Sequence, residues 1–171
     1  MRVVPYDPSW PASFEAARGD LAAVVPEALA IEHVGSTSVP GLASKPTVDV
    51  LLVVDELALV LDRTSELADI GFEYRPGSFA PERHHLFFRR MAGGGRTHHL
   101  HVLASSSPEP DDYRLFRDYL RANPDAAASY EAAKFNLADR FARDRTSYVQ
   151  AKEPIVEELL AAARAWRDDL R

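Results

Sequence analysis

The order of hydrophobic and polar positions along the chain predicts a small mixed β-sheet with helices before, between and after its strands. Pro11 suits the first turn of a helix, where a backbone N–H is not needed. The apolar positions that follow recur at helical spacing: Leu21, Val24, Val25 and Leu29. Residues 30–34 are then a candidate for a short strand that ends at Gly35-Ser36.

A second strand is predicted at residues 47–54, which are apolar almost throughout. Such a run is typical of a central strand that is covered on both faces. Asp55 suits the N-cap of a following helix, which Gly71 would end. The apolar positions of that helix are Leu57, Val60, Leu61 and Ile70.

Two further strand-like runs, 84–91 and 97–103, flank three consecutive glycines at 93–95 and therefore predict a hairpin. From Pro110 the pattern is helical, with breaks near 123–124 and 145–146. Pro154 either begins or kinks the last helix. Its amphipathic face comprises Ile155, Val156, Leu159, Leu160, Ala163 and Trp166. The fold class we expect is α/β (α+β), with one domain over residues 1–171.

Composition narrows the class of protein. With 46% hydrophobic and 27% charged residues in 171, the chain has the make-up of a soluble globular domain rather than a fibre or coiled coil. The absence of cysteine excludes disulfide scaffolds, iron–sulfur proteins, thiol enzymes and cysteine-bound zinc. A net charge of −6 argues against general nucleic-acid or membrane binding. Since no apolar run has the length of a signal peptide or a membrane span, we expect a cytoplasmic protein.

The segment 33–50 carries most of the chemical information. Gly35 allows the backbone to approach a ligand closely. Ser36, Thr37 and Ser38 supply hydroxyls and successive N–H groups, from which an anion-binding nest can be built. The prolines and glycine at 40, 41 and 46 leave room only for a short helical turn before the chain returns. That return would bring Asp49 beside Gly35.

Asp49 interrupts an apolar strand, where an ionised carboxylate is costly unless a metal or a hydrogen-bonding partner compensates it. One interpretation is a functional carboxylate that holds a metal. The other is a structural carboxylate that binds loop N–H groups or pairs with Lys45 or an arginine. The residue pattern alone leaves both open.

Gly35-Ser36, twelve intervening residues and then Asp49 resemble the signature of the nucleotidyltransferase superfamily related to DNA polymerase β. The resemblance implies that the Gly-Ser loop holds the phosphates of a nucleotide and that a carboxylate pair on the next strand holds divalent metal. In this chain the position of the second carboxylate is Leu51. Clustered oxygen ligands are what Mg²⁺ prefers, so this departure weakens the expected metal site.

The chain also resembles the GrpB family over nearly its whole length. The matching residues are 6–10 (Tyr-Asp-Pro-Ser-Trp), 33–42, Lys45-Pro46, Asp49, 99–102 (His-Leu-His-Val), Phe116-Arg117, Tyr130, Lys134, Tyr148 and Lys152. This resemblance implies a nucleotidyltransferase-like fold. It also raises Lys134 and Lys152 from ordinary surface lysines to phosphate contacts. GrpB-like domains occur fused behind dephospho-CoA kinases as well.

Five of the six histidines lie between positions 84 and 101. On a strand, His99 and His101 would share one face, and with Asp49 they would form a two-histidine, one-carboxylate set. Such a set suits Zn²⁺, Mn²⁺ or Fe²⁺ better than Mg²⁺. Alternatively, one histidine acts as a general base or binds phosphate, or both are ordinary hydrogen-bonded strand residues. When the resemblance is considered as well, we expect a divalent metal as the cofactor, and we favour Mg²⁺ or Mn²⁺ over Zn²⁺.

Among the remaining residues, strand alternation sends either Arg89 or Arg90 to the histidine face, and we assign Arg89 to it as a phosphate contact. Arg96, beside the glycine turn, is expected to be solvated. The aromatic residues near the two ends, Trp10, Phe14 and Trp166, are expected to pack between the terminal helices.

The leading hypothesis is a metal-dependent nucleotidyltransferase that moves a nucleoside monophosphate from a nucleoside triphosphate (NTP) to an unknown acceptor. Asp49 and His101 would be catalytic, and Asp49, His99 and His101 would hold the metal. The phosphate contacts would be Gly35, Ser36, Thr37, Ser38, Lys45, Arg89, Lys134 and Lys152. One alternative is a non-catalytic module that binds a nucleotide or a CoA-like compound, and another is a histidine-metal phosphoesterase. The expected partner is a small phosphate-bearing ligand, with no nucleic acid and no membrane.

Overall fold

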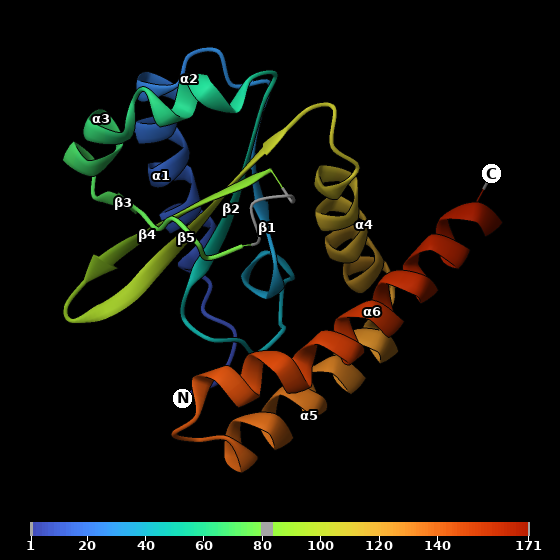
Figure 1. Ribbon diagram of the computed structural model, residues 1–171. Helices are drawn as coiled ribbons and strands as arrows, with labels where there is room; N and C mark the ends of the chain where they lie inside the picture. Colours follow the sequence, from blue (N-terminus) through green and yellow to red (C-terminus); the bar gives the residue numbers. More distant parts are fainter. Residues whose placement is uncertain (1, 80–83, 171) are drawn as a thin grey trace.

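The computed structural model describes residues 2–79 and 84–170 and is built around one five-stranded sheet in the order β1-β2-β5-β4-β3 (Figure 1). The strands are β1 (Ala30–Val34), β2 (Val48–Val54), β3 (Phe72–Tyr74), β4 (His85–Ala92) and β5 (Gly95–Ala104). Strand β2 pairs parallel with β5, and the other neighbouring strands pair antiparallel. The mixed sheet flanked by helices confirms the fold class expected from the sequence.

Strand β2 lies between β1 and β5, and the prediction of an interior strand is confirmed. Val50, Leu52 and Val54 are fully buried in the main core. Leu51 and Val53 are buried on the opposite face, in a separate apolar cluster. Because consecutive side chains of a strand point to opposite faces, Asp49 lies on the same face as Leu51.

The helices cover the two faces unequally (Figure 1). They are α1 (Trp10–Val24), α2 (Leu57–Leu61), α3 (Thr64–Asp69), α4 (Glu109–Ala122), α5 (Pro124–Arg140) and α6 (Arg145–Asp169), with one 3₁₀ turn, η1 (Ser36–Ser38). Helices α1 to α3 lie on one side of the sheet, whereas α4 lies on the other. Helices α5 and α6 form an antiparallel pair that extends away from the sheet. The face toward α4 is therefore only partly covered.

The main core forms where α1 packs on the sheet. Trp10, Phe14, Ala17 and Leu21 from the helix join the even-numbered apolar residues of β2 and β5. Phe14 also stacks on the ring of His33, with centroids 5.0 Å apart. Trp166, by contrast, contacts Tyr119 of α4. The expectation that these aromatic residues pack together between the terminal helices is wrong, because the sheet and α4 separate them.

Three details of the observed helices differ from those predicted from the sequence. Helix α1 ends at Val24, so Leu29 falls outside it and is 58% exposed. The segment after β2 forms two short helices instead of one, since the Thr64 hydroxyl donates to the Leu61 carbonyl and satisfies the end of α2. Asp55 is not the N-cap of α2 and accepts a hydrogen bond from Ser105 instead.

The helical breaks in the C-terminal part are close to the predicted positions. The first falls between α4 and α5 at Asn123, as expected. The second precedes Arg145, because Asp144 caps α6 by accepting from the Ser147 N–H at 3.0 Å. Pro154 lies inside α6, so the alternative in which it begins this helix is wrong. No helix within the described residues has the length and apolar character needed to cross a membrane.

Candidate functional site

The turn between β1 and β2 brings Gly35 against Asp49. Gly35 has a φ of +70°, and η1 follows it at once. Its neighbour Val34 pairs with Asp49 across the two strands. A Cβ at Gly35 would lie 3.1 Å from the Cβ of Asp49 and would overlap its carboxylate. The glycine therefore permits both the left-handed backbone and the close approach.

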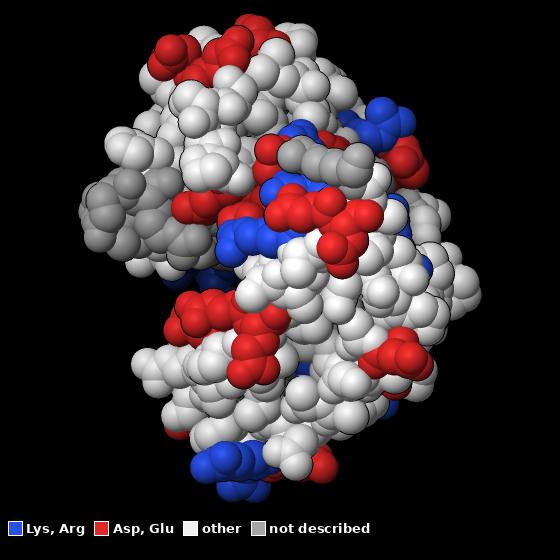
Figure 2. All heavy atoms as spheres, turned by 90° about the vertical axis from the view of Figure 1, so that its right-hand side faces the viewer, with Lys and Arg blue, Asp and Glu red and all other residues white. Residues whose placement is uncertain are grey.

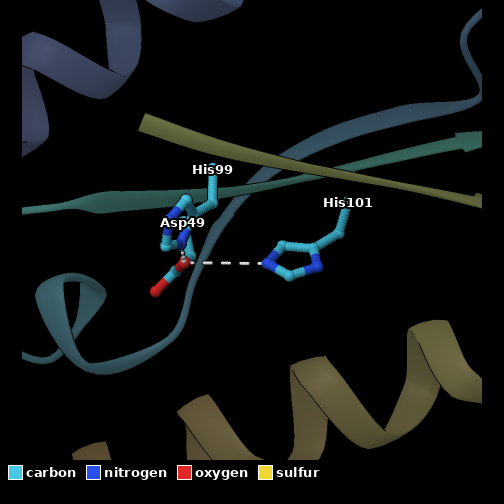
Figure 3. A group of neighbouring side chains, drawn as sticks. All are labelled: Asp49, His99 and His101. Atoms are coloured by element: carbon cyan, nitrogen blue, oxygen red, sulfur yellow. Dashed lines mark hydrogen bonds and ion pairs between the residues drawn. The ribbon is translucent and has the colours of Figure 1, made fainter. Parts of the chain in front are cut away.

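His99 and His101 face the same carboxylate from strand β5 (Figure 3). Nδ1 of His99 is 3.1 Å from Oδ1 of Asp49, and Nε2 of His101 is 3.6 Å from the same oxygen. One ligand atom from each of the three residues lies within 4.8 Å of the others. The predicted three-residue cluster is thus present as a spatial arrangement.

The donor set fits a divalent metal. It combines two imidazoles with one carboxylate, which first-row transition metals accept more readily than Mg²⁺ does. Among the described residues, Nε2 of His99 is buried without a hydrogen-bond partner. A buried polar atom of this kind calls for an ion, a water or strain to account for it.

The electrostatics of Asp49 favour its anionic form. Burial acts to raise the pKa of Asp49, but the adjacent imidazoles of His101 and His99 outweigh this effect and hold the pKa well below its usual range. The carboxylate therefore stays ionised and is better suited to bind a cation than to accept a proton.

The position where the superfamily carries its second carboxylate is filled with hydrocarbon. Leu51 is fully buried and packs with Val34, Val53 and Leu103. Across the strands it pairs with Glu32 on one side and His101 on the other. Glu32 is held by Arg114 at 2.7 Å and Arg117 at 3.0 Å. A two-carboxylate site of the superfamily's kind is not formed on β2.

The cluster opens into a cavity of about 930 Å³ between the sheet and the C-terminal helices. Figure 2 shows the molecule hollowed on this side, between an upper and a lower mass. Five cationic residues line the cavity: Arg75, Arg89, Arg96, Arg145 and Lys152. Carboxylates also line it: Asp49, Glu109, Asp112, Glu153 and Glu157. The cavity thus offers both signs of charge together with apolar wall residues from α4 and α6.

Arg96, which was expected to be solvated, is part of this lining and is half-buried. Burial first, and then the nearby Arg145, Arg89 and Arg75, lower its pKa from the usual value. All four arginines line this one cavity. Sequence reasoning missed Arg75 and Arg145 because each comes from a different segment, and only folding brings them to one cavity.

Arg89 has the predicted orientation. It pairs with His99 across β4 and β5 and lines the cavity, whereas Arg90 lies on the other face beside Asp20 and the Ile70 carbonyl. Arg89 also forms an ion pair with Glu73 at 3.2 Å. A phosphate would have to share this guanidinium with Glu73.

The loop residues divide into two groups. Gly35 and Ser36 line the cavity. Thr37 and Ser38 are buried, and their hydroxyls bond to His33 at 2.9 Å and to the Gly35 carbonyl at 2.6 Å. The structure therefore does not bring these two hydroxyls to the cavity, and their bonds instead stabilise the turn.

The three predicted lysines also separate. Lys152 lines the cavity, and Tyr130 is the main neighbour that raises its pKa, against the opposing effect of burial. Lys45 lies over the ring of Tyr148, 3.7 Å from its centroid, outside the residues that line the cavity. Burial and then Lys152 and Arg145 lower the pKa of Lys45 to about 7.

Lys134 is 3% exposed and donates to the Ala43 carbonyl, so it joins α5 to the loop before β2 instead of lining the cavity. Burial and then Lys152 lower its pKa to about 7. The unfolded chain, with a lysine pKa of about 10.4, binds more protons between these two values. The free energy of unfolding should therefore rise as the pH increases from about 7 to 10.

We expect this rise to be smaller in Lys134→Met, measured by urea unfolding at a series of pH values. Because all other groups are common to both proteins, the difference isolates Lys134. An equal rise in wild type and variant would show that burial of this ammonium does not control the pH dependence.

Comparison with known proteins gives the family. Residues 1–162 match the family described as GrpB protein. The chain belongs to the GrpB family. It is 39% identical over 96% of its length to a UPF0157 protein of Pseudomonas aeruginosa, of which the match covers 68%. It is also 30% identical to the glutamate-rich protein GrpB of Alkalihalophilus pseudofirmus, with 92% of each chain covered.

Some relatives of this GrpB chain are longer. A dephospho-CoA kinase of Mycolicibacterium paratuberculosis is 30% identical over 98% of the chain, which spans only 47% of that protein. The crystal structure of GrpB from Enterococcus faecalis matches 96% of this chain and 99% of its own, at 32% identity and a TM-score of 0.87.

More distant structures share the fold. The Cid1 poly(U) polymerase, solved as an H336N mutant bound to MgATP, matches 82% of this GrpB chain and 45% of its own at 16% identity and a TM-score of 0.57. This similarity confirms the nucleotidyltransferase-like fold that the loop and strand motif indicated.

Proposed function

We propose that this GrpB protein binds a nucleoside triphosphate together with a divalent metal in the cavity, and transfers a nucleoside monophosphate to an acceptor. The observation that carries the proposal is the meeting of Gly35, Asp49, His99 and His101 at one edge of a cavity that is also lined by cations. The fold shared with a polymerase that is bound to MgATP supports the same reaction class.

Asp49, His99 and His101 would hold the metal, which supplies charge neutralisation and polarisation at the transferred phosphorus. Gly35 lets the phosphate chain approach the backbone beside Ser36. Arg96, Arg145 and Lys152 would bind the phosphate oxygens, since no carboxylate of the described residues forms an ion pair with these three side chains. Preorganised cations of this kind stabilise the charge that develops in phosphoryl transfer.

In this reaction an acceptor oxygen or nitrogen forms a bond to the α-phosphorus. The bond from the α-phosphorus to the bridging oxygen breaks, and pyrophosphate leaves with the electron pair. The acceptor proton would pass to water in the open cavity.

The direct test compares wild type with Asp49→Asn, which keeps the shape of the side chain and removes its charge. We expect calorimetry with Mn²⁺ and an α,β-methylene NTP to show at least about a 100-fold loss of affinity in the variant. Asp139→Asn, an exposed change on α5, is the matched control and should bind as wild type does. Equal binding by wild type and Asp49→Asn would contradict the proposal.

A second candidate, metal-dependent binding without transfer, is favoured by the buried Leu51 at the position of the second carboxylate. An α-labelled NTP with Mn²⁺ and a fractionated lysate separates the two. Label on an acceptor supports transfer, whereas tight binding with no label moved supports the binding module. Because some relatives are named dephospho-CoA kinase, CoA is a second probe for the same cavity.

A further inference from the structure

Three side chains lie behind His101, on the side away from Asp49. Its Nδ1 is 3.1 Å from Nε2 of His85 on β4 and 3.2 Å from the hydroxyl of Tyr113 on α4. Nδ1 of His85 is in turn 3.5 Å from Oε2 of Glu109, in the first turn of α4. Glu109, His85 and His101 therefore form a continuous chain of polar contacts that ends at Asp49.

The rings of this chain are held in place by packing. The side chain of His85 is completely buried and stacks on Phe79, with centroids 3.7 Å apart and planes 9° from parallel. His101 is 9% exposed and contacts the rings of Phe87 and Tyr113. Sequence reasoning placed His85 only within a histidine-rich stretch, because neither its partner on β5 nor Glu109 is visible from spacing.

We assign the protons from the chemistry of the two ends. An ionised carboxylate can only accept, so we place the proton of His85 on Nδ1, which faces Glu109 across an ion-pair distance of 3.5 Å. Nε2 of His85 is then an acceptor, and Nδ1 of His101 must donate to it. A neutral imidazole has one N–H, so Nε2 of His101 presents its lone pair toward the carboxylate of Asp49.

In the opposite order of protons, Nε2–H of His101 would face Asp49 at 3.6 Å, which is beyond the usual range for a hydrogen bond. The contact of His85 with Glu109, at 3.5 Å, is likewise an ion-pair distance, so the choice between the two orders depends on the surroundings of Asp49. The same oxygen already lies 3.1 Å from Nδ1 of His99. A lone pair that faces a carboxylate is an arrangement that a cation between the two groups stabilises.

We propose that Glu109 and His85 are positioning residues that fix the tautomer and ring orientation of His101, so that its Nε2 lone pair faces Asp49. The use of this lone pair as a metal ligand rests on the function proposed above. Metal-binding histidines commonly donate their other N–H to a partner that sets the tautomer. In this protein the partner is a second histidine, which Glu109 orients.

The first test reads the tautomer of His101 by ¹⁵N–¹H correlation spectroscopy of the metal-free full chain. We expect wild type to show the Nδ1–H form. His85→Gln keeps a side-chain carbonyl that can accept from His101 and should retain this form. His85→Leu removes the acceptor and should shift His101 toward the Nε2–H form, and Glu109→Leu should do the same without altering the contact to His101.

The second test measures binding of Mn²⁺ alone by calorimetry. We expect about a 10- to 100-fold weaker affinity in His85→Leu and Glu109→Leu, and a smaller loss in His85→Gln. His98→Gln is the matched control, since His98 lies on the opposite face and bonds to Ser13; it should bind Mn²⁺ as wild type does.

An Nε2-protonated or doubly protonated His101 in wild type, or an unchanged tautomer in both leucine variants, would overturn the proposal. If wild type has the expected tautomer and the variants shift it, the positioning role is supported even where no Mn²⁺ binds. If Mn²⁺ does not bind in that case, only the proposed metal-dependent function is contradicted.

Discussion

Replacing Gly35 with alanine is expected to lower the free energy of unfolding by about 2–5 kcal/mol and to abolish binding of Mn²⁺ with the NTP analogue. Gly35 has a φ of +70°, a conformation that costs an L-residue energy. The new Cβ would also overlap the carboxylate of Asp49. Since β1 and β2 are paired at this point, neither strand can move aside without loss of hydrogen bonds.

Gly19→Ala is the matched control for this change. Gly19 is exposed in helix α1, and a Cβ there meets no atom within 4 Å. Because alanine restricts the unfolded chain, this variant should gain about 0.4–1 kcal/mol and bind as wild type does. Denaturant unfolding and calorimetry measure both effects. A Gly35→Ala protein as stable as wild type would show that the close approach to Asp49 is not required.

The second large effect is expected at Leu51. Changing it to aspartate would remove buried hydrocarbon and place a charge in the cluster with Val34, Val53 and Leu103. We expect the free energy of unfolding to fall by about 3–6 kcal/mol in the absence of metal. Yet the new carboxylate would lie on the same face as Asp49 and beside His101, and would supply the missing oxygen ligand.

Saturating Mn²⁺ should therefore restore part of the stability of Leu51→Asp, by about 2.7 kcal/mol at 100 times its dissociation constant. Leu51→Asn removes the same hydrocarbon without adding a charge, so its recovery should be no greater than that of wild type. Thermal melting with and without Mn²⁺ measures the difference. Equal responses of the two variants would mean that position 51 cannot contribute to a metal site.

The central strand of the sheet could be predicted because burial on both faces requires a nearly continuous apolar run. Strand β1 was predicted with its observed bounds, and β2 to within one residue. The glycine turn between β4 and β5 was readable because Gly93 and Gly94 adopt positive φ angles, which few other residues tolerate. The break between α2 and α3 could not be predicted from the sequence, because it depends on the hydrogen bond from Thr64 to a carbonyl of the preceding turn.

The sequence predicted the residues that meet around Asp49, but it did not predict correctly which residues surround them. Gly35 and Asp49 belong to one local turn, so their spacing indicated their contact. Strand alternation placed His99 and His101 on one face, whereas their position beside Asp49 depends on the parallel pairing of β5 with β2, which the structure shows. Thr37, Ser38 and Lys45 were predicted as phosphate contacts from their chemistry, and Lys134 from the family resemblance. The hydroxyls of Thr37 and Ser38 instead bond within the turn, and both lysines lie outside the cavity lining.

What the sequence determined by itself is local: a glycine that permits a tight turn, an acid within an apolar strand, and two histidines on one strand face. Tertiary structure alone decided which groups surround them. Arg75, Arg96 and Arg145, and the chain from Glu109 through His85, come from segments far apart along the chain. The physical reason is that backbone geometry fixes neighbours within a turn or strand, whereas contacts between segments depend on how their buried faces pack.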